Sequence, residues 1–502
     1  MDIFQSSFQG FATILTPFNL WMATLGCFFG TIVGILPGLG PSATIAMLLP
    51  LTFGMDATPA MVMMTSIYYG AKYGGSTTSI LINVPGEGAS VVTTFDGYQM
   101  ARQGRGGVAL GISAIGSFFA GIVGTFGLIL VAVPLALFSL KFGPAEYFSL
   151  IVMGMLTIVF VGSKSIIKSL MTAVIGLALG TVGTDVVQGA PRFVYGVTEL
   201  SDGISFVVVV MGVFGIGEVL VSAEERLKMK TVDVKFKNLW PTVADVLQSK
   251  WAILRGTVIG FFVGALPGAG STIASFISYG IEKGVAKEPE RFGKGAIEGV
   301  AGPESANNSA CSGAMVPLLA LGIPGSGATA VMLGALMLYG LRPGPMLFTT
   351  NPDFVWAIIA SMFVGNIILI IMNLPMVPMF ALSLKVPYRF LYPAILLICV
   401  IGAYSLNNNV YDVWVMLIFG VFGYFMKKFD IPGAPLVIAL VLGPMLEYNL
   451  YRAVGLARGD VTTFFTRPIS ATLLAIAALM TVGVMFKTVR MKRALIEEED
   501  DD

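Results

Sequence analysis

Residues 26–40 read Gly-Cys-Phe-Phe-Gly-Thr-Ile-Val-Gly-Ile-Leu-Pro-Gly-Leu-Gly, and residues 256–270 read Gly-Thr-Val-Ile-Gly-Phe-Phe-Val-Gly-Ala-Leu-Pro-Gly-Ala-Gly. Glycine recurs at every fourth position in both stretches, which start 230 residues apart, at 26 and 256. Glycines with this spacing lie on one side of a helix and let another backbone come close. The Pro-Gly-x-Gly end then breaks the helix. A broken helix that occurs twice in an apolar chain is typical of transporters built from two halves.

A second pair of motifs supports the same division. Residues 83–90 read Asn-Val-Pro-Gly-Glu-Gly-Ala-Ser, and residues 322–329 read Gly-Ile-Pro-Gly-Ser-Gly-Ala-Thr, an offset of 239 from 83 to 322. A small, polar, glycine-rich run precedes each of them, at 69–79 and at 302–313. Each half is therefore predicted to contain two Pro-Gly interruptions, as broken helices or re-entrant hairpins.

The composition indicates a membrane protein. The chain of 502 residues is 56% hydrophobic and 12% charged, whereas soluble domains contain about 25% charged residues. Charge-free stretches such as 3–55, 106–140, 305–341 and 354–384 each exceed the roughly 20 residues that cross a bilayer as a helix, and several are expected to fold back. The short alternating strands of a β-barrel are not evident. We predict an all-α polytopic membrane protein with about 10–14 spans.

The basic residues indicate a topology. Segment 223–255 holds seven Lys and Arg residues, and a basic cluster follows residue 486. Basic segments tend to stay in the cytoplasm, so the second half should start there, and the C-terminus should be cytoplasmic. No Lys or Arg precedes Lys72, so the first half should start outside, and the two repeats would be inverted. The predicted parts are a first transmembrane repeat (15–222), a cytoplasmic polar linker (223–255), a second transmembrane repeat (256–486) and a cytoplasmic charged tail (487–502).

The sequence lacks the residues and motifs that mark other classes of function. Histidine is absent, the net charge is +1, and the three cysteines are isolated in apolar segments. Neither a metal cluster, a disulfide framework nor a nucleic-acid surface is indicated. The chain has no Gly-x-x-x-x-Gly-Lys-Ser/Thr motif for ATP, no Gly-x-Ser-x-Gly elbow and no paired intramembrane carboxylates. No catalytic residue and no cofactor are predicted.

The interruptions are the expected site. Exposed N–H groups at helix ends attract carboxylates, and carbonyl, hydroxyl and amide oxygens suit a hard cation such as sodium. The predicted substrate-binding residues are Pro37, Gly38, Gly40, Ser42, Thr44, Lys72, Gly74, Gly75, Ser76, Thr77, Thr78, Pro267, Gly268, Gly270, Ser271, Thr272, Gly325 and Ser326. The predicted ion-binding residues are Ser79, Asn83, Asn307, Asn308, Ser309 and Ser312.

Each of these residues has a plainer interpretation. A single Ser or Thr can bond to its own helix, and small residues can simply let helices pack. Lys72 is either a counter-ion for a substrate carboxylate or a side chain that extends to the membrane interface. Glu87 and Glu304 lie beside the polar runs and are expected in loops, with a role as ion ligands as the alternative.

At these residues the chain resembles the large membrane subunit of the bacterial tripartite tricarboxylate transporters. The resemblance rests on residues 36–42 (Leu-Pro-Gly-Leu-Gly-Pro-Ser), the run 69–76 with Val-Pro-Gly at 84–86, residues 265–270, and Gly-Ile-Pro-Gly at 322–325. It covers roughly residues 15–485.

The resemblance implies a permease of the bacterial inner membrane that works with a small membrane subunit and a periplasmic solute-binding protein. It also implies carboxylate substrates, with citrate-like tricarboxylates as the founding class, and uptake driven by a sodium or proton gradient. The hydroxyl and amide runs favour sodium, and alternating access by an elevator motion is a hypothesis. A carboxylate symporter that needs no binding protein is the main alternative, and an intramembrane enzyme is a remote one.

Overall fold

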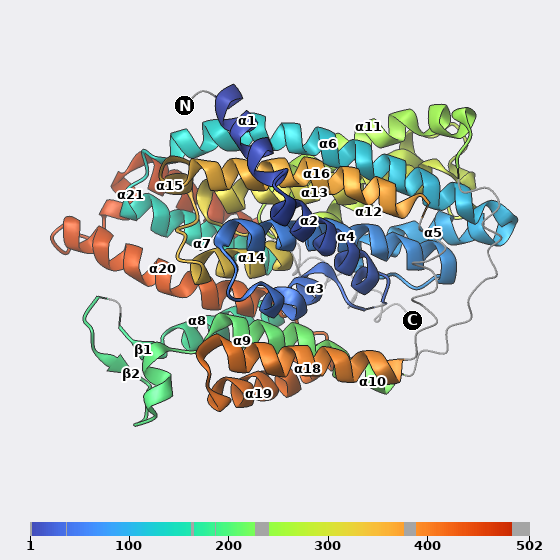
Figure 1. Ribbon diagram of the computed structural model, residues 1–502. Helices are drawn as coiled ribbons and strands as arrows, with labels where there is room; N and C mark the ends of the chain where they lie inside the picture. Colours follow the sequence, from blue (N-terminus) through green and yellow to red (C-terminus); the bar gives the residue numbers. More distant parts are fainter. Residues whose placement is uncertain are drawn as a thin grey trace, which may run out of the picture. The chain divides into compact units, whose positions relative to one another are not determined.

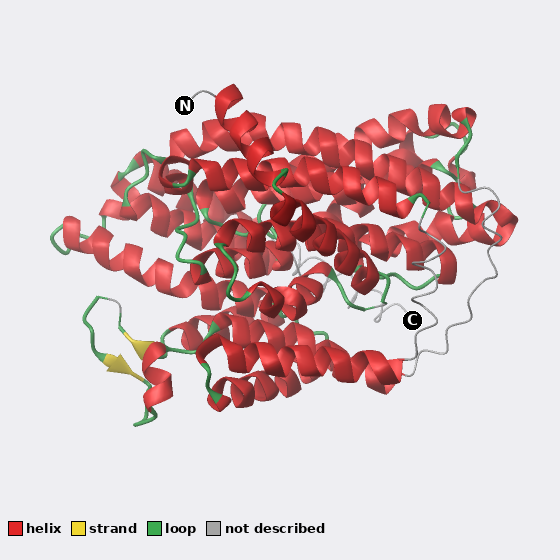
Figure 2. Cartoon of the chain, in the orientation of Figure 1, coloured by secondary structure: helices red, strands yellow, loops and turns green. Residues whose placement is uncertain are grey.

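The computed structural model describes residues 3–36, 38–161, 165–185, 187–225, 240–375 and 388–483. In these ranges the chain folds almost entirely into helices, with one pair of two-residue strands (Figure 2). The chain packs as two compact units, one formed by Met1–Leu140 with Ser205–Gly433 and the other by Lys141–Ile204 with Ala434–Asp502. The all-α fold expected from the sequence is confirmed, whereas the boundaries 15–222, 223–255, 256–486 and 487–502 remain predictions.

The first unit contains both glycine-rich stretches. Its N-terminal part consists of α1 (Ile3–Ile14), α2 (Pro17–Gly34), α3 (Pro41–Leu48), η1 (Leu49–Thr52), α4 (Ala57–Ile82), η2 (Gly88–Ser90), α5 (Val91–Met100), η3 (Ala101–Arg105) and α6 (Gly106–Ser139). Its second part consists of α9 (Phe206–Val210), η5 (Met211–Ile216), α10 (Gly217–Glu225), α11 (Val243–Ala265), α12 (Gly270–Val285), η7 (Pro289–Arg291), α13 (Glu298–Leu321), α14 (Gly327–Leu338), α15 (Pro345–Thr350), α16 (Pro352–Asn373), α18 (Tyr388–Asn407) and α19 (Val410–Lys428).

The glycines of the first stretch face a neighbouring backbone. Helix α2 lies along α4 (Figure 1), and a Cβ atom on Gly30 would lie 2.6 Å from the carbonyl oxygen of Ile67. In the same way, Cβ atoms on Gly26 and Gly34 would meet the carbonyl oxygens of Met63 and Ala71, which lie one turn of α4 before and after Ile67. Only glycine allows two helices to approach this closely, so the stripe determines which face of α2 packs on α4.

The second stretch packs in the same way. The glycines of α11 at 256, 260 and 264 face the carbonyl oxygens of Gly302, Ala306 and Ala310 in α13. The facing residues in α4 and α13 are again 239 apart, as with 63 and 302. The two halves thus build matching helix pairs from matching positions. Whether the pairs are inverted across a membrane stays a prediction.

All four predicted interruptions are present among the described residues. After α2 the chain turns at Gly38 (φ +87°), and after α11 it turns at Gly268 (φ +82°). Helix α4 ends at Asn83 and α13 ends at Gly322, both in the left-handed conformation that closes helices. Helix α14 then restarts behind Ser326, whose side chain forms a capping box with Thr329.

The second unit is smaller. It consists of α7 (Pro144–Val161), α8 (Ile166–Gly180), the antiparallel strands β1 (Gly183–Thr184) and β2 (Pro191–Arg192), η4 (Thr198–Asp202), α20 (Ala434–Leu456), α21 (Thr463–Thr466) and a helical segment Pro468–Gly483. Gly176 of α8 packs against the backbone of Leu436 in α20, and Arg467 pairs with Glu146 at 2.7 Å.

The described helices suit a membrane protein. Six are long and apolar enough to cross a membrane: Pro17–Gly34, Gly88–Ser139, Phe206–Glu224, Pro352–Asn373, Val410–Lys428 and Ala434–Leu456. Six shorter apolar helices of 10–17 residues accompany them. The charge-free stretch 305–341 folds back at Gly322 as expected, whereas α6 remains a single helix of 34 residues. The total number of spans stays a prediction.

Candidate functional site

Within each half, the two interruptions lie side by side. In the first half, a Cβ atom on Gly86 would lie 2.6 Å from the carbonyl oxygen of Gly34, at the end of α2. In the second half, the N–H of Gly268 donates to the carbonyl oxygen of Gly325 at 3.0 Å. The ends of broken helices are therefore grouped in pairs, as the repeated motifs suggested.

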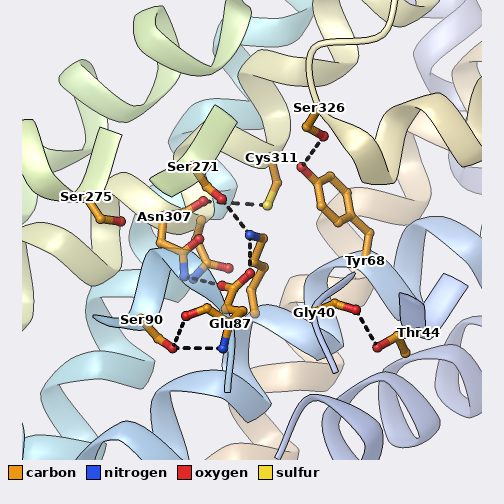
Figure 3. Close-up of polar contacts among 12 residues, drawn as sticks. Gly40, Thr44, Tyr68, Glu87, Ser90, Ser271, Ser275, Asn307, Cys311 and Ser326 are labelled. Atoms are coloured by element: carbon orange, nitrogen blue, oxygen red, sulfur yellow. Dashed lines mark hydrogen bonds and ion pairs between the residues drawn. The ribbon is translucent and has the colours of Figure 1, made fainter. Parts of the chain in front are cut away.

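Four polar side chains join the two halves, and we call Lys72, Glu87, Ser271 and Asn307 the polar hub. The Nζ atom of Lys72 lies 2.6 Å from Oε2 of Glu87 and donates to Oγ of Ser271, also at 2.6 Å. The Nδ2 group of Asn307 donates to Oε1 of Glu87 at 2.9 Å. Figure 3 shows Ser271, Asn307 and Glu87 turned toward one another. Two members come from each half of the chain.

The local structure explains how each member reaches the hub. Lys72 extends from the middle of α4, and Asn307 from the middle of α13, the two helices against which the glycine stripes of α2 and α11 pack. Glu87 lies in the interruption between α4 and η2, and its backbone N–H is bonded to Ser90 at 3.2 Å. Ser271 lies in the first turn of α12, directly after the interruption at Gly268. The interruptions thus bring loop and helix-end residues beside the interior helices.

Burial makes the hub electrostatically significant. Lys72 is 3% exposed and Glu87 is 8% exposed, so of the two interpretations of Lys72, extension to the membrane interface does not fit the structure. The expectation of loops for both glutamates holds for Glu87 only, which is nevertheless buried. Glu304 lies within α13 and is fully buried. A buried charge is tolerated only when it is paired, and Lys72 and Glu87 are paired with each other.

Glu304 forms a second buried cluster near the hub. Its carboxylate accepts hydrogen bonds from Ser76 of α4 and from Thr93 of α5. A helix of the second half is thereby bonded to two helices of the first. No cation pairs with Glu304 among the described residues.

The predicted ion-binding residues of α13 leave oxygens without partners. Oδ1 of Asn307, Oδ1 of Asn308 and Oγ of Ser309 are buried and lack a hydrogen bond in the described part of the chain. Ser312 differs, since its hydroxyl lies 2.6 Å from the hydroxyl of Tyr69. Unpaired buried oxygens are the ligands that a hard cation prefers.

Other predicted residues bond within their own helix. Thr44 donates to the carbonyl oxygen of Gly40, and Thr77 to that of Tyr73. Thr78 and Ser79 both donate to the carbonyl oxygen of Gly75. For these hydroxyls the structure shows the back-bonding that was the plainer interpretation.

The remaining predicted residues have varied surroundings. Asn83 is exposed and caps the C-terminal end of α4, and a Cβ atom on Gly88 would lie 2.9 Å from Oγ1 of Thr272 in the other half. Ser326 lies 3.5 Å from the hydroxyl of Tyr68 and caps α14. Pro37 lies outside the described residues. The predicted residues without a polar side chain are Gly38, Gly40, Gly74, Gly75, Pro267, Gly268, Gly270 and Gly325, and Ser42 is partly buried in the first turn of α3. Their role in substrate binding stays a prediction.

Sequence reasoning missed a third buried carboxylate. Asp96 of α5 accepts hydrogen bonds from the N–H groups of Gly293, Gly295 and Ala296 and from the hydroxyl of Tyr279, at 2.8–2.9 Å. This contact fastens the end of the first-half hairpin to the charged insert of the second half. The sequence feature that could have revealed this contact is the charge of Asp96 inside the otherwise uncharged segment 88–101.

A cavity of about 480 Å³ lies apart from the hub, between α11, α12 and the start of α13. Its walls hold the ion pairs Arg255–Glu282 and Arg291–Glu298, at 2.6 and 2.8 Å. None of the predicted site residues lines it. Its acidic residues Glu282, Glu288 and Glu298 are all paired with arginines.

Long apolar helices, paired helix interruptions and a buried polar centre define a multi-pass helical membrane protein of the transporter type. A family model described as the tripartite tricarboxylate transporter TctA family matches residues 20–438. The chain belongs to this family, and the resemblance seen in the motifs is confirmed.

Two proteins from Agrobacterium vitis are also similar. An uncharacterized 52.8 kDa protein in the TAR-I ttuC' 3'region is 46% identical over 501 residues, which is 100% of both chains. An uncharacterized protein in the TAR-II ttuC' 3'region is 46% identical over 242 residues, which is 48% of this chain and all of that protein. No solved structure matches.

Proposed function

We propose that this protein takes up carboxylates, such as citrate or a related organic acid, across the bacterial inner membrane by secondary active transport. A cation gradient drives uptake, a periplasmic binding protein delivers the substrate, and a small membrane subunit completes the system. Membership of a tripartite transporter family supports the class of this proposal. The observation that carries the substrate assignment is the polar hub at the interruptions.

The hub has the chemistry to hold an anion. The ammonium group of Lys72 lies 2.6 Å from Ser271 in the first turn of α12, where helix N–H groups remain unpaired. An ammonium group next to a helix N-terminus favours a carboxylate by charge and by hydrogen bonding. Lys72 is only 3% exposed, and the low dielectric of a buried site strengthens both effects.

The charges of the hub favour co-transport with a cation. Lys72 and Glu87 already neutralise each other, so a carboxylate substrate would add uncompensated negative charge in a buried site. A cation that binds with the substrate removes this cost. The unpaired oxygens of Asn307, Asn308 and Ser309 support sodium as that cation.

Uptake of radiolabelled citrate and other carboxylates into vesicles tests this function. Vesicles with the small subunit and the binding protein receive an imposed sodium or proton gradient. Accumulation that needs the gradient and is competed by unlabelled carboxylate supports the proposal, and uptake without any gradient dependence contradicts it. Omitting the binding protein tests its role, because unchanged uptake would indicate a self-sufficient symporter.

A further inference from the structure

The carboxylate of Glu87 occupies the place at Lys72 that a substrate carboxylate would need. Both of its oxygens are engaged, Oε2 by Lys72 and Oε1 by Asn307. Lys72 also donates a hydrogen bond to Oγ of Ser271. The chain thus holds an internal carboxylate in its own anion site.

A substrate that binds Lys72 would leave two carboxylates at one ammonium group. In a buried site this arrangement has an excess negative charge, and an uncompensated buried charge is strongly unfavourable. Water cannot relieve it, since Glu87 is only 8% exposed. A positive charge must therefore reach Glu87 when the substrate reaches Lys72.

Asn307 supplies a ligand for such a charge at the required place. Its Nδ2 group already touches Glu87, and its Oδ1 atom is buried with no hydrogen-bond partner in the described part of the chain. Carboxylate and amide oxygens are together the ligands that a hard cation prefers. The other buried acidic groups nearby have different partners: Asp96 holds three amide groups, and Glu304 holds two hydroxyls.

We propose that Glu87 exchanges Lys72 for the coupling cation, sodium, when a substrate carboxylate binds. Substrate on Lys72 and sodium on Glu87 and Asn307 then require each other, because each removes the charge imbalance that the other creates. The exchange therefore couples substrate binding to sodium binding electrostatically, through the carboxylate of Glu87. This inference rests on the proposed function and names the residue that links its two ligands.

Binding of radiolabelled citrate and of other di- and tricarboxylates to the purified protein, in sodium chloride or choline chloride at fixed pH, tests the exchange. Sodium should tighten binding to the wild type by roughly 5- to 150-fold, the range typical of coupled sites. In Glu87→Gln, which carries no charge at this position, the effect of sodium should fall below about twofold, and binding without sodium should be tighter than in the wild type. Glu87→Asp should keep the sodium effect.

Glu282→Gln is the matched control, because Glu282 is also a buried glutamate in an ion pair, with Arg255, but lies outside the hub. It should keep the full sodium effect. Thermal unfolding and gel filtration verify that each variant is folded. A wild-type sodium effect that persists in Glu87→Gln overturns the exchange while leaving the proposed function intact, and so does a dependence on pH without one on sodium. Absence of any carboxylate binding to the wild type contradicts the proposed function itself.

Discussion

The Nζ atom of Lys72 lies 2.6 Å from Oε2 of Glu87, and each side chain is 4% exposed. The two residues are 15 positions apart and are separated by the interruption that ends α4 at Asn83. A continuous helix over this segment would place them about 22 Å apart along its axis, at 1.5 Å per residue. The Pro-Gly interruption is therefore what creates the ion pair.

This pairing predicts strong coupling between the two side chains. Lys72→Met should lower the free energy of unfolding by about 3–5 kcal/mol, because it leaves the carboxylate of Glu87 buried without a cation. The double variant Lys72→Met with Glu87→Gln should lose less than Lys72→Met alone. Denaturant unfolding of both single variants and the double variant measures the coupling, and additive losses would show that the pair is not a unit.

The glycine stripes predict a second effect on stability. Gly260→Ala should destabilise the protein by about 1–3 kcal/mol, because the added methyl group meets the backbone of Ala306 and forces two helices apart. Gly280→Ala in α12 is the control, since nothing lies within 4 Å of its Cβ position. It should be neutral or stabilising by up to about 1 kcal/mol. Equal thermal midpoints for the two variants would contradict the close packing of α11 on α13.

Asp96 predicts a local effect at the charged insert. Asp96→Ala removes the acceptor of three N–H groups and should cost about 1–3 kcal/mol for leaving buried donors unpaired. Hydrogen exchange should rise at Gly293, Gly295 and Ala296 and change little elsewhere. Asp353→Ala, at an exposed position in the first turn of α16, provides the comparison. Unchanged protection of 293–296 would mean that Asp96 does not hold this loop.

The elevator hypothesis predicts a substrate-dependent crosslink between α6 and α13. A Cβ atom on Gly124 would lie 3.0 Å from the Cβ of Ser312, so cysteines at both positions are close enough to form a disulfide after a small shift. With the native cysteines 27, 311 and 399 replaced, crosslinking should be efficient without substrate and severalfold slower with substrate and sodium. Identical rates in both conditions would count against movement of α13 along α6.

The loop after α8 predicts a pH effect outside the spans. Hydrogen bonds from the backbone N–H groups of Gln188 and Val187, with the nearby Arg192, lower the pKa of Asp185. A lowered folded-state pKa contributes stability above the ordinary aspartate pKa of about 3.9 and loses it as the pH falls through the lowered value. Asp185→Asn should therefore unfold at a lower temperature than the wild type at pH 7.

The same comparison in acid provides the check. The difference between the two thermal midpoints should narrow as the pH falls below about 3.9. A difference that is constant across this range would show that the carboxylate charge of Asp185 is not what stabilises the loop.

Much of the fold could be predicted because it depends on local rules. Apolar stretches without charge form membrane helices, glycines four residues apart form a packing face on a helix, and a Pro-Gly pair ends that helix. The four interruptions were placed correctly for this reason. The partners of Gly30 and Gly260 were not predictable, since a packing face does not say which helix it meets.

The candidate site was only partly predictable. Lys72, Ser271 and Asn307 were proposed from residue type and position, and the structure brings them together. The buried contacts of Glu87, Glu304 and Asp96 were not predicted, because the sequence alone does not distinguish a buried carboxylate from one in a solvated loop. Burial depends on segments that are distant in the sequence.

The amino-acid sequence alone determined that this is a helical membrane protein with two similar glycine-rich stretches and four helix interruptions, since each of these follows from composition or from spacing within a short window. Only the tertiary structure decided that Lys72 is neutralised by Glu87 and reaches Ser271 from the other half. That outcome depends on packing between α4, α12 and α13, and a buried charge takes as its partner whichever polar group the packing brings within hydrogen-bond distance.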